Sequence, residues 1–246
     1  MRTLVILPTY NEILNVETML RTLREVVPSA DILVVDDDSP DGTAKVAEKI
    51  AEELGQIHLL SRPAKAGLGG AYRAGFTWGL ERDFEYFVEI DCDFSHDPRS
   101  LPSLLVAAST HEVVIGSRYI KGGVIPKWSL SRKLLSRGGN EYATIMLGLK
   151  VADSTSGFRV YSKSALEKIH YQSVTADGYG FQIEMTHRAR RGGASIIEVP
   201  ISFTDRTHGD SKMSKSIVIE ALWLVTKWAV ERPFANRKSL DAVDQN

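Results

Sequence analysis

Short runs of apolar residues alternate with longer stretches of helical periodicity along the first half of the chain. The runs are apolar at nearly every position, which is typical of strands that helices cover on both faces. Strands that alternate with helices at this spacing predict a mostly parallel, doubly wound α/β sheet. We expect the first four strands at Leu4–Leu7, Ile32–Val35, Ile57–Leu60 and Phe87–Ile90.

Three helices are predicted between these strands, at about Leu14–Val27, Ala44–Leu54 and Gly67–Leu80. The glycines that open the third helix do not have the G-x-G-x-x-G spacing of a dinucleotide site, and they follow the third strand rather than the first. Two explanations stay open for them. The glycines allow a close approach either to a ligand or to the sheet.

The second half predicts further strands at Val113–Gly116 and Ser195–Ile201, and a turn into a short strand within Asp153–Tyr161. Helical patterns cover Tyr179–Arg190 and Ser214–Val230, the latter apolar nearly all round, so it packs on the domain or a partner or lies in a membrane surface. We therefore expect one domain at 1–213, which is large enough to be a catalytic domain. A packing or amphipathic helix at 214–232 and a polar, disordered tail at 233–246 should follow it.

Composition narrows the class of protein. The chain has 246 residues, 43% hydrophobic and 25% charged, with a net charge of −1, so nothing draws it globally to nucleic acid. Its one cysteine, Cys92, rules out an internal disulfide and fits a reducing compartment. The N-terminal apolar run is too short for a signal peptide, and no window offers about 18 uncharged apolar residues for a membrane span.

Polar and acidic residues follow several of the predicted strands. In a doubly wound sheet, ligands bind outside the carboxyl ends of the strands, so these residues should meet at one edge. Asp91 and Asp93 follow the fourth strand, and a flat continuation of that strand would point both carboxylates the same way. Two such oxygen ligands suit Mg²⁺ or Mn²⁺ holding a diphosphate. The alternative is that they only solvate a loop. Similar groups follow the first two strands: Tyr10, Glu12, Asp36 and Asp37.

A basic segment runs from Arg118 to Asn140, with six cations and no acid. Trp128 and Leu130 lie among the cations. Basic residues mixed with apolar and aromatic ones suit a membrane-interfacial segment or an anion site. A solvated helix face is the alternative.

A polar loop follows the last strand, at Phe203–Met213. Arg206 and Lys212 could close over phosphates, because both offer donors to phosphate oxygens. An ordinary solvated loop is the alternative.

Seven motifs, in order along Leu4–Ser214, resemble the polyprenol (dolichol) phosphate mannosyltransferases, which are family 2 glycosyltransferases of the GT-A fold. The N-terminal motifs occur in many family 2 enzymes, whereas Trp128–Gly139, Ser156–Arg159 and the Arg206–Lys212 loop are more specific to the polyprenol-phosphate branch. The motifs are Pro8–Glu12, Val35–Thr43, Gly67–Gly69, Asp91–Asp93, Gly116–Tyr119, Ser156–Arg159 and Arg206–Lys212.

The resemblance implies a role for each matching position. In such enzymes a nucleotide sugar is held beside a metal ion, and cations bind phosphates of the donor or the acceptor. Ser95 stands where relatives can have glutamine, which puts its part in metal binding in doubt. The implied catalytic residues are Asp91, Asp93 and Arg118, and the implied metal ligands are Asp93 and Ser95. The residues implied to bind the nucleotide sugar are Pro8, Tyr10, Glu12, Val35, Asp37, Asp91, Cys92, Asp93, Arg118, Arg206 and Lys212. The residues implied to contact the acceptor or the membrane are Trp128, Arg132, Lys133, Arg137, Ser156 and Arg159.

The implied reaction is transfer of mannose from GDP-mannose to a polyprenyl phosphate, with inversion and with Mg²⁺ or Mn²⁺. The implied location is the cytoplasmic face of a membrane, as a peripheral protein, with a membrane-anchoring protein as a further partner. Two alternatives stay open: the same chemistry with UDP-glucose or UDP-N-acetylglucosamine, and a nucleotide-sugar-binding protein without catalysis. A nucleotidyltransferase fits less well, because the first strand lacks a glycine-rich phosphate loop.

Overall fold

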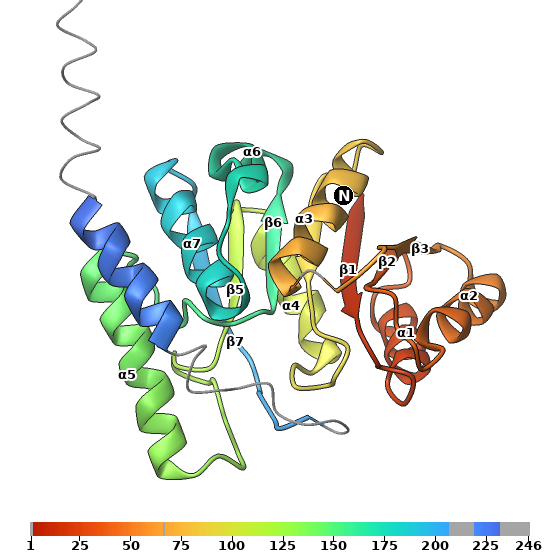
Figure 1. The fold of residues 1–246 in the computed structure, drawn as a ribbon, viewed down its shortest axis with the longest axis horizontal. Coiled ribbons are helices and arrows are strands. Elements are labelled where there is room, and N and C mark those ends of the chain that lie inside the picture. The colour runs from red at the N-terminus through yellow and green to blue at the C-terminus, as the bar shows by residue number, and fades with distance from the viewer. Residues whose placement is uncertain (1, 66, 207–218, 232–246) are drawn as a thin grey trace, which may run out of the picture.

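A seven-stranded sheet forms the centre of the protein in a computed structural model that describes residues 2–65, 67–206 and 219–231 (Figure 1). The strand order is β3-β2-β1-β4-β6-β5-β7. The strands are β1 (Thr3–Thr9), β2 (Asp31–Asp36), β3 (Ile57–Ser61), β4 (Tyr86–Glu89), β5 (Val113–Ser117), β6 (Arg159–Ser162) and β7 (Ile196–Pro200).

One strand, β6, runs against the others. It pairs antiparallel with both β4 and β5, while the remaining neighbours pair in parallel. The register places Arg159, at the start of β6, opposite Glu89, at the end of β4. The loop that enters β6 therefore lies at the sheet edge where the parallel strands end. This reversal brings a segment of the second half of the chain beside Asp91.

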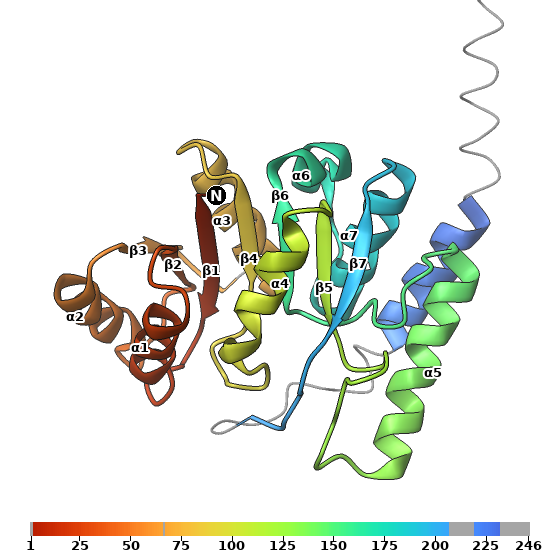
Figure 2. The same cartoon turned by 180° about the vertical axis from the view of Figure 1, so that it is seen from behind.

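Helices cover both faces of the sheet (Figures 1 and 2). Successive residues of β1 point to opposite faces, and all of Leu4–Leu7 are fully buried, as a strand between two helical layers requires. One apolar core includes residues of α1 (Val16–Val26), α2 (Thr43–Leu54) and α4 (Leu101–Ala108). The other includes residues of α3 (Leu68–Leu80), α5 (Leu130–Leu147), α6 (Lys163–Ile169) and α7 (Gly178–Arg191).

A helix over 219–231 lies beside α5 at the end of the molecule, as both cartoon views show (Figures 1 and 2). Its Val225 is 1% exposed and belongs to the core that α5 and α7 share. Tyr142 on α5 and Thr226 join their hydroxyls at 2.8 Å. This part of the predicted C-terminal helix therefore packs on the domain.

The predicted fold class, an α/β GT-A fold with a mostly parallel sheet covered on both faces, is confirmed. The seven predicted strands are present, with ends that differ by a few residues. The pattern missed α4 and α6, which are eight and seven residues long and too short to show a clear period. It also did not give the direction of β6. Two short 3₁₀ turns, Pro98–Ser100 and Tyr171–Ser173, complete the named elements.

Candidate active site

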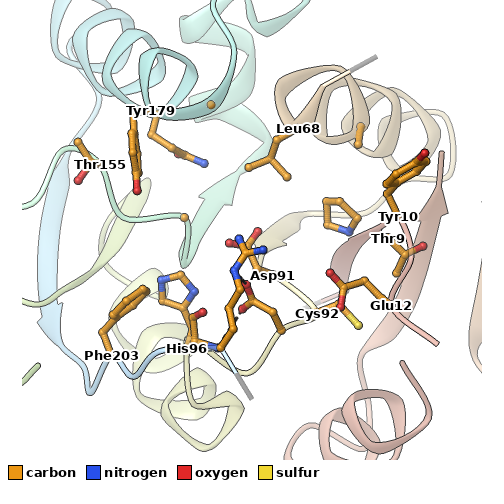
Figure 3. Close-up of a pocket in the computed structure, with 18 of the residues that line it drawn as sticks. Thr9, Tyr10, Glu12, Leu68, Asp91, Cys92, His96, Thr155, Tyr179 and Phe203 are labelled. Carbon is orange, nitrogen blue, oxygen red and sulfur yellow. Dashed lines mark hydrogen bonds and ion pairs between the residues drawn. The ribbon is translucent and has the colours of Figure 1, made fainter. Parts of the chain in front are cut away.

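A cavity of about 590 Å³ opens at the carboxyl ends of β1, β4 and β5 (Figure 3). Tyr10 and Glu12 lie on one side of it, and Tyr179 and Phe203 lie on the other, with Asp91 between. This is the edge where doubly wound sheets bind ligands. The volume is in the range of small-molecule sites. The fold thus gathers the predicted polar strand ends into one pocket.

The side of the pocket near β1 and β2 is ordered by short polar contacts. Nζ of Lys65 lies 4.1 Å from the centre of the Tyr10 ring, and both residues line the pocket. A guanidinium nitrogen of Arg62 donates to Asp37 at 2.8 Å. Asp36 instead holds the strand ends together, accepting from Thr9 at 2.8 Å. Asp37 is therefore the one of these two aspartates that faces the pocket.

The chain does not continue flat after β4 but turns at Cys92 and Asp93. Asp91 accepts a hydrogen bond from the Tyr72 hydroxyl at 3.2 Å. Asp93 accepts from the main-chain N–H of Ser95 at 2.9 Å, and its other oxygen pairs with Nε of Arg206 at 2.7 Å. Because of the turn, different contacts fix the two carboxylates, although both line the pocket.

The donor chemistry at this turn suits a hard divalent cation. Asp91, Asp93 and Ser95 all line the pocket and offer only oxygen, the ligand type that Mg²⁺ and Mn²⁺ prefer. Among the described residues no cluster of three or more histidine, cysteine, aspartate or glutamate side chains could hold a metal alone. Oxygens of water or of a bound diphosphate would complete the coordination. The residues fit a metal that binds together with its substrate.

A buried ion pair fixes the pocket end of β5. Arg118 donates from Nε and a terminal nitrogen to the two oxygens of Asp153, at 2.7 and 2.6 Å, and to the Thr155 hydroxyl at 2.7 Å. Burial alone would raise the pKa of Asp153, but Arg118 outweighs burial and lowers it. The pair stays charged, and it holds Arg118 in the pocket lining.

A second cation site lies on the same side. Arg132 stacks over Trp128, with its guanidinium carbon 3.9 Å from the ring centre. The indole N–H and a guanidinium N–H both donate to Asp205, at 3.0 and 2.8 Å. Trp128, Arg132 and Asp205 all line the pocket. This wall therefore carries the basic and aromatic character expected of the segment from Arg118.

Arg159 occupies a different place from the one that the resemblance implies. It is fully buried, and its guanidinium donates to the main-chain oxygens of Ser154, Ser156 and Gln182 at 2.7, 2.7 and 3.1 Å. Ser156 is 1% exposed. The implied acceptor contact through these two side chains does not fit this geometry. Arg159 instead joins the loop before β6 to α7.

Glu89 lies in the same buried network. It is fully buried at the end of β4 and accepts a hydrogen bond from Nε2 of Gln182 at 2.8 Å. Burial raises the pKa of Glu89 to about 8, although Arg159 and Gln182 work in the opposite direction. Burial likewise lowers the pKa of His96 to about 4, so this imidazole is neutral at physiological pH. The core next to the pocket therefore holds two uncharged titratable groups.

The glycines at the start of α3 serve close helix packing. A Cβ atom at Gly69 would lie 2.7 Å from the Phe181 ring on α7, and one at Gly75 would lie 2.6 Å from Ile6. The main-chain N–H of Gly69 also donates to Asp177 at 2.7 Å, just before α7. Close packing thus accounts for Gly69, against α7 rather than against the sheet, while Gly67 lines the pocket.

The pocket gathers most of the predicted site residues. Val35 is fully buried, and neither it nor Lys133 nor Arg137 is among the lining residues. Lys212 lies outside the described part of the chain. Those that line the pocket are Pro8, Tyr10, Glu12, Asp37, Asp91, Cys92, Asp93, Ser95, Arg118, Trp128, Arg132 and Arg206.

The sequence reasoning missed a second group of lining residues, several of which the loop before β6 and the start of α7 bring to the pocket. His96 directly follows the predicted metal-binding segment Asp91–Ser95, and Gln182 lies in the first turn of the helix predicted at Tyr179–Arg190. These two positions are the ones that the sequence could have indicated. Nothing in the sequence pattern showed that these segments meet. The main members of this group are Lys65, His96, Thr155, Gly157, Asp177, Tyr179, Gln182 and Phe203.

Together, the sheet, the acidic turn after β4 and the cationic wall define a glycosyltransferase. The model of glycosyl transferase family 2 matches residues 4–170, and the chain belongs to this family. Two relatives cover nearly its whole length. The undecaprenyl-phosphate mannosyltransferase of Micrococcus luteus is 50% identical over 230 residues, 94% of this chain and 95% of that protein. The polyprenol monophosphomannose synthase of Mycolicibacterium smegmatis is 45% identical over 231 residues, 93% of this chain and 87% of that protein.

Solved structures share the fold at low identity. The mannosyltransferase PcManGT from Pyrobaculum calidifontis, in complex with GDP-Man and Mn²⁺, has a TM-score of 0.59 and 18% identity, covering 100% of this chain and 76% of that one. S. aureus TarS 1–349 in complex with UDP-GlcNAc has a TM-score of 0.60 and 17% identity, covering 92% of this chain and 65% of that one. These similarities establish the GT-A architecture of the present chain.

Proposed function

We propose that this glycosyltransferase moves mannose from GDP-mannose to a polyprenyl phosphate, giving polyprenyl-phosphate β-mannose and GDP. One observation carries the proposal. A single pocket is lined both by the oxygen donors Asp91 and Asp93 and by the arginines Arg118 and Arg132. That arrangement fits a metal-bound nucleotide diphosphate on one side and an anionic acceptor on the other. The names of the two near-full-length relatives support the choice of mannose and lipid phosphate.

In this proposal the β1–β2 side of the pocket binds the nucleoside. Tyr10 offers a ring face for the base, with Lys65 beside it, and Glu12 and Asp37 offer carboxylates to hydroxyl and amine donors. Asp93 and Ser95 would hold the divalent metal, and Asp91 would lie beside the ribose and the diphosphate. The metal, when bound, neutralises the diphosphate and stabilises it as a leaving group.

The acceptor needs no strong general base. The second pKa of a phosphate monoester is about 6, so the acceptor is largely dianionic at neutral pH and already nucleophilic. The residues must instead position two anions against each other and screen their repulsion. Arg118 and Arg132 would hold the acceptor phosphate, and Arg206 would bind the departing diphosphate. Attack from the face opposite the leaving group inverts the anomeric centre.

The lipid chain of the acceptor gives the basic segment its role. Leu130, Leu134 and Leu135 on the first half of α5 are 72%, 62% and 58% exposed, and Lys133 and Arg137 share this part of the helix. Exposed leucines with cations suit the surface of an anionic bilayer. Within the described residues, no helix is long and apolar enough to cross a membrane. We propose peripheral attachment at the cytoplasmic face, with α5 toward the lipid.

A donor panel tests the function. Purified protein is incubated with polyprenyl phosphate, Mn²⁺ or Mg²⁺, and radiolabelled GDP-mannose, UDP-glucose or UDP-N-acetylglucosamine, and the label entering the organic phase is measured. We expect transfer from GDP-mannose alone, and loss of transfer with a chelator. Transfer from a UDP-sugar instead would reassign the donor, and no transfer from any donor would leave a nucleotide-sugar-binding protein. Asp93→Asn is the inactive control.

A further inference from the structure

Three polar side chains from two segments, the loop after β4 and helix α7, surround Gly157 in the pocket. A Cβ atom added at Gly157 would lie 3.7 Å from Oδ2 of Asp91, 3.9 Å from Nε2 of Gln182 and 3.9 Å from Cε1 of His96. All four residues line the pocket, and Figure 3 shows Asp91 and His96 at its centre. We name these four residues the Gly157 cup. The space at its middle exists because residue 157 has no side chain.

The cup contains polar atoms that the described residues leave unsatisfied. Oε1 of Gln182 and both ring nitrogens of His96 are buried and have no hydrogen-bond partner. Burying such a group without a partner is unfavourable. Native structures rarely keep such groups without a reason. Their position in the lining of a substrate pocket indicates that a bound ligand satisfies them.

The side chains of the cup are held in place from behind. Gln182 donates Nε2 to the buried Glu89 at 2.8 Å, and its main-chain oxygen accepts from Arg159 at 3.1 Å. The His96 ring lies between Phe158 and Phe203, with ring centres 5.6 and 5.0 Å away. These contacts fix the orientation of the unpaired atoms before any ligand binds, as a specific binding site requires.

The charge of the cup decides the kind of ligand. Asp91 is the one charged residue of the cup, whereas the unpaired atoms of Gln182 and His96 belong to side chains that bind neutral polar groups. The cations Arg118 and Arg132 line the same pocket but are not among the four residues around Gly157. A neutral group with several hydroxyls can donate to Asp91 and to the Gln182 oxygen, and can exchange hydrogen bonds with His96.

We infer that the Gly157 cup binds the hydroxyl groups of the sugar ring that is transferred, and that Gly157 sets which sugars fit. This inference rests on the proposed function and assigns residues to its sugar. An added methyl group would take the space of a hydroxyl while leaving the nucleoside side, at Tyr10 and Asp37, untouched. The cup should therefore affect nucleotide sugars but not the free nucleotide.

Gly157→Ala is the decisive variant. The main chain at Gly157 is outside the left-handed region, and the new methyl group would make only ordinary van der Waals contacts, so the protein should fold. With Mn²⁺ present, calorimetry measures binding of GDP and of GDP-mannose, and a transfer assay measures kcat/KM. We expect GDP affinity to stay within about twofold and kcat/KM for GDP-mannose to fall at least about tenfold. Ser103→Ala on α4, which changes an exposed residue outside the pocket, is the control and should behave as wild type.

His96→Phe provides an independent test. Phenylalanine keeps the ring contacts with Phe158 and Phe203 but removes both unpaired nitrogens, so thermal stability should not fall. Transfer should fall nevertheless, which a purely structural role for His96 would not produce. Wild-type turnover in both variants, or an equal loss of GDP and GDP-mannose affinity in Gly157→Ala, would overturn the inference. A wild-type protein that transfers no sugar would instead refute the proposed function.

Discussion

A single buried carboxyl, that of Glu89, couples the stability of the protein to pH. Glu89 is fully buried, and burial raises its pKa to about 8 from an ordinary value of 4.5. Between these two values the unfolded chain releases the proton while the folded chain keeps it. Raising the pH through this window therefore favours unfolding, with a slope of up to about 1.4 kcal/mol per pH unit from this one group. Below pH 4.5 both states keep the proton and the effect ends.

Glu89→Gln should remove this dependence. The amide oxygen can still accept from Gln182, and the group no longer titrates. In urea unfolding at pH 5, 6, 7 and 8, we expect the variant to lose less stability with rising pH than the wild type does. Glu112→Gln is the control, because Lys168 and other contacts lower the pKa of Glu112 to about 2, outside this window. Equal slopes for Glu89→Gln and the wild type would refute the assignment.

Among the elements, α5 has two unlike ends. Its last part belongs to the core through Ala143 and Leu147, which are 1% and 3% exposed. Its first part carries exposed leucines and the cations Lys133 and Arg137. Several large exposed apolar side chains together mark an interaction surface, and with cations beside them they suit an anionic bilayer. The first part is thus the element on which the membrane proposal depends.

The paired substitution Leu134→Glu and Leu135→Glu tests this element. Two buried charges are costly at a lipid surface, and they also repel anionic headgroups. We expect co-sedimentation with vesicles of anionic lipid to fall several-fold, and transfer to a long-chain acceptor to fall with it. Transfer to a short, water-soluble acceptor phosphate should be unchanged. Val106→Glu, which replaces a 73% exposed valine on α4, is the control for an exposed apolar residue elsewhere.

Element patterns predicted much of this fold but only part of its site. Uninterrupted apolar runs were enough to place β1 and β2 between two helical layers, and the topology rule then placed Asp91 and Asp93 at a ligand-binding edge. The pairing of β6 depends on contacts between distant segments, such as Glu89 with Arg159, that no local pattern encodes. For the same reason the sequence did not show that Gly157 and Gln182 meet Asp91. Arg159 was misplaced because a charged residue in a motif suggests a ligand contact, whereas here it satisfies main-chain oxygens.

At the scale of the whole molecule, the pocket joins two halves with different tasks. The β1–β2 side supplies Tyr10 and Asp37, and the β5–α5 side supplies Arg118 and Arg132. In the proposed function the first half binds the nucleotide and the second binds the acceptor phosphate. Binding of the nucleotide to the β1–β2 side should not need the arginines of the β5–α5 side. Measurements of thermal stability with bound nucleotide can separate the contributions of the two sides.

Thermal shifts with GDP and Mn²⁺ test this division. A ligand at 100 times its Kd stabilises the folded state by about 2.7 kcal/mol, which is a rise in Tm of several degrees for a chain of this size. We expect Tyr10→Ala to lose most of this shift and Arg132→Met to keep it while losing transfer to acceptor. A full shift in Tyr10→Ala, or none in Arg132→Met, would contradict the division.

Two neighbouring residues of opposite charge, Asp205 and Arg206, reach to different walls of the pocket. Arg206 pairs with Asp93 at 2.7 Å, and Asp205 pairs with Arg132 at 2.8 Å. Arg206 thus occupies the side of Asp93 where the proposal places a metal cation. Asp205 likewise contacts Arg132, where the proposal places the acceptor phosphate. These two side chains therefore compete with the metal and with the acceptor phosphate for the same contacts. The measured affinities for both ligands would include the free energy of displacing Arg206 and Asp205.

Competition of this kind has a direct consequence for the metal. Mn²⁺ alone must displace Arg206 and so should bind weakly, whereas Mn²⁺ with GDP brings phosphates that Arg206 can bind instead. Arg206→Gln should therefore tighten the binding of Mn²⁺ in the absence of nucleotide, as followed by electron paramagnetic resonance of the free ion, and weaken that of Mn²⁺ with GDP. Arg99→Gln, on an exposed arginine outside the pocket, should change neither. The affinity of the protein for Mn²⁺ would then depend on whether the donor nucleotide is bound.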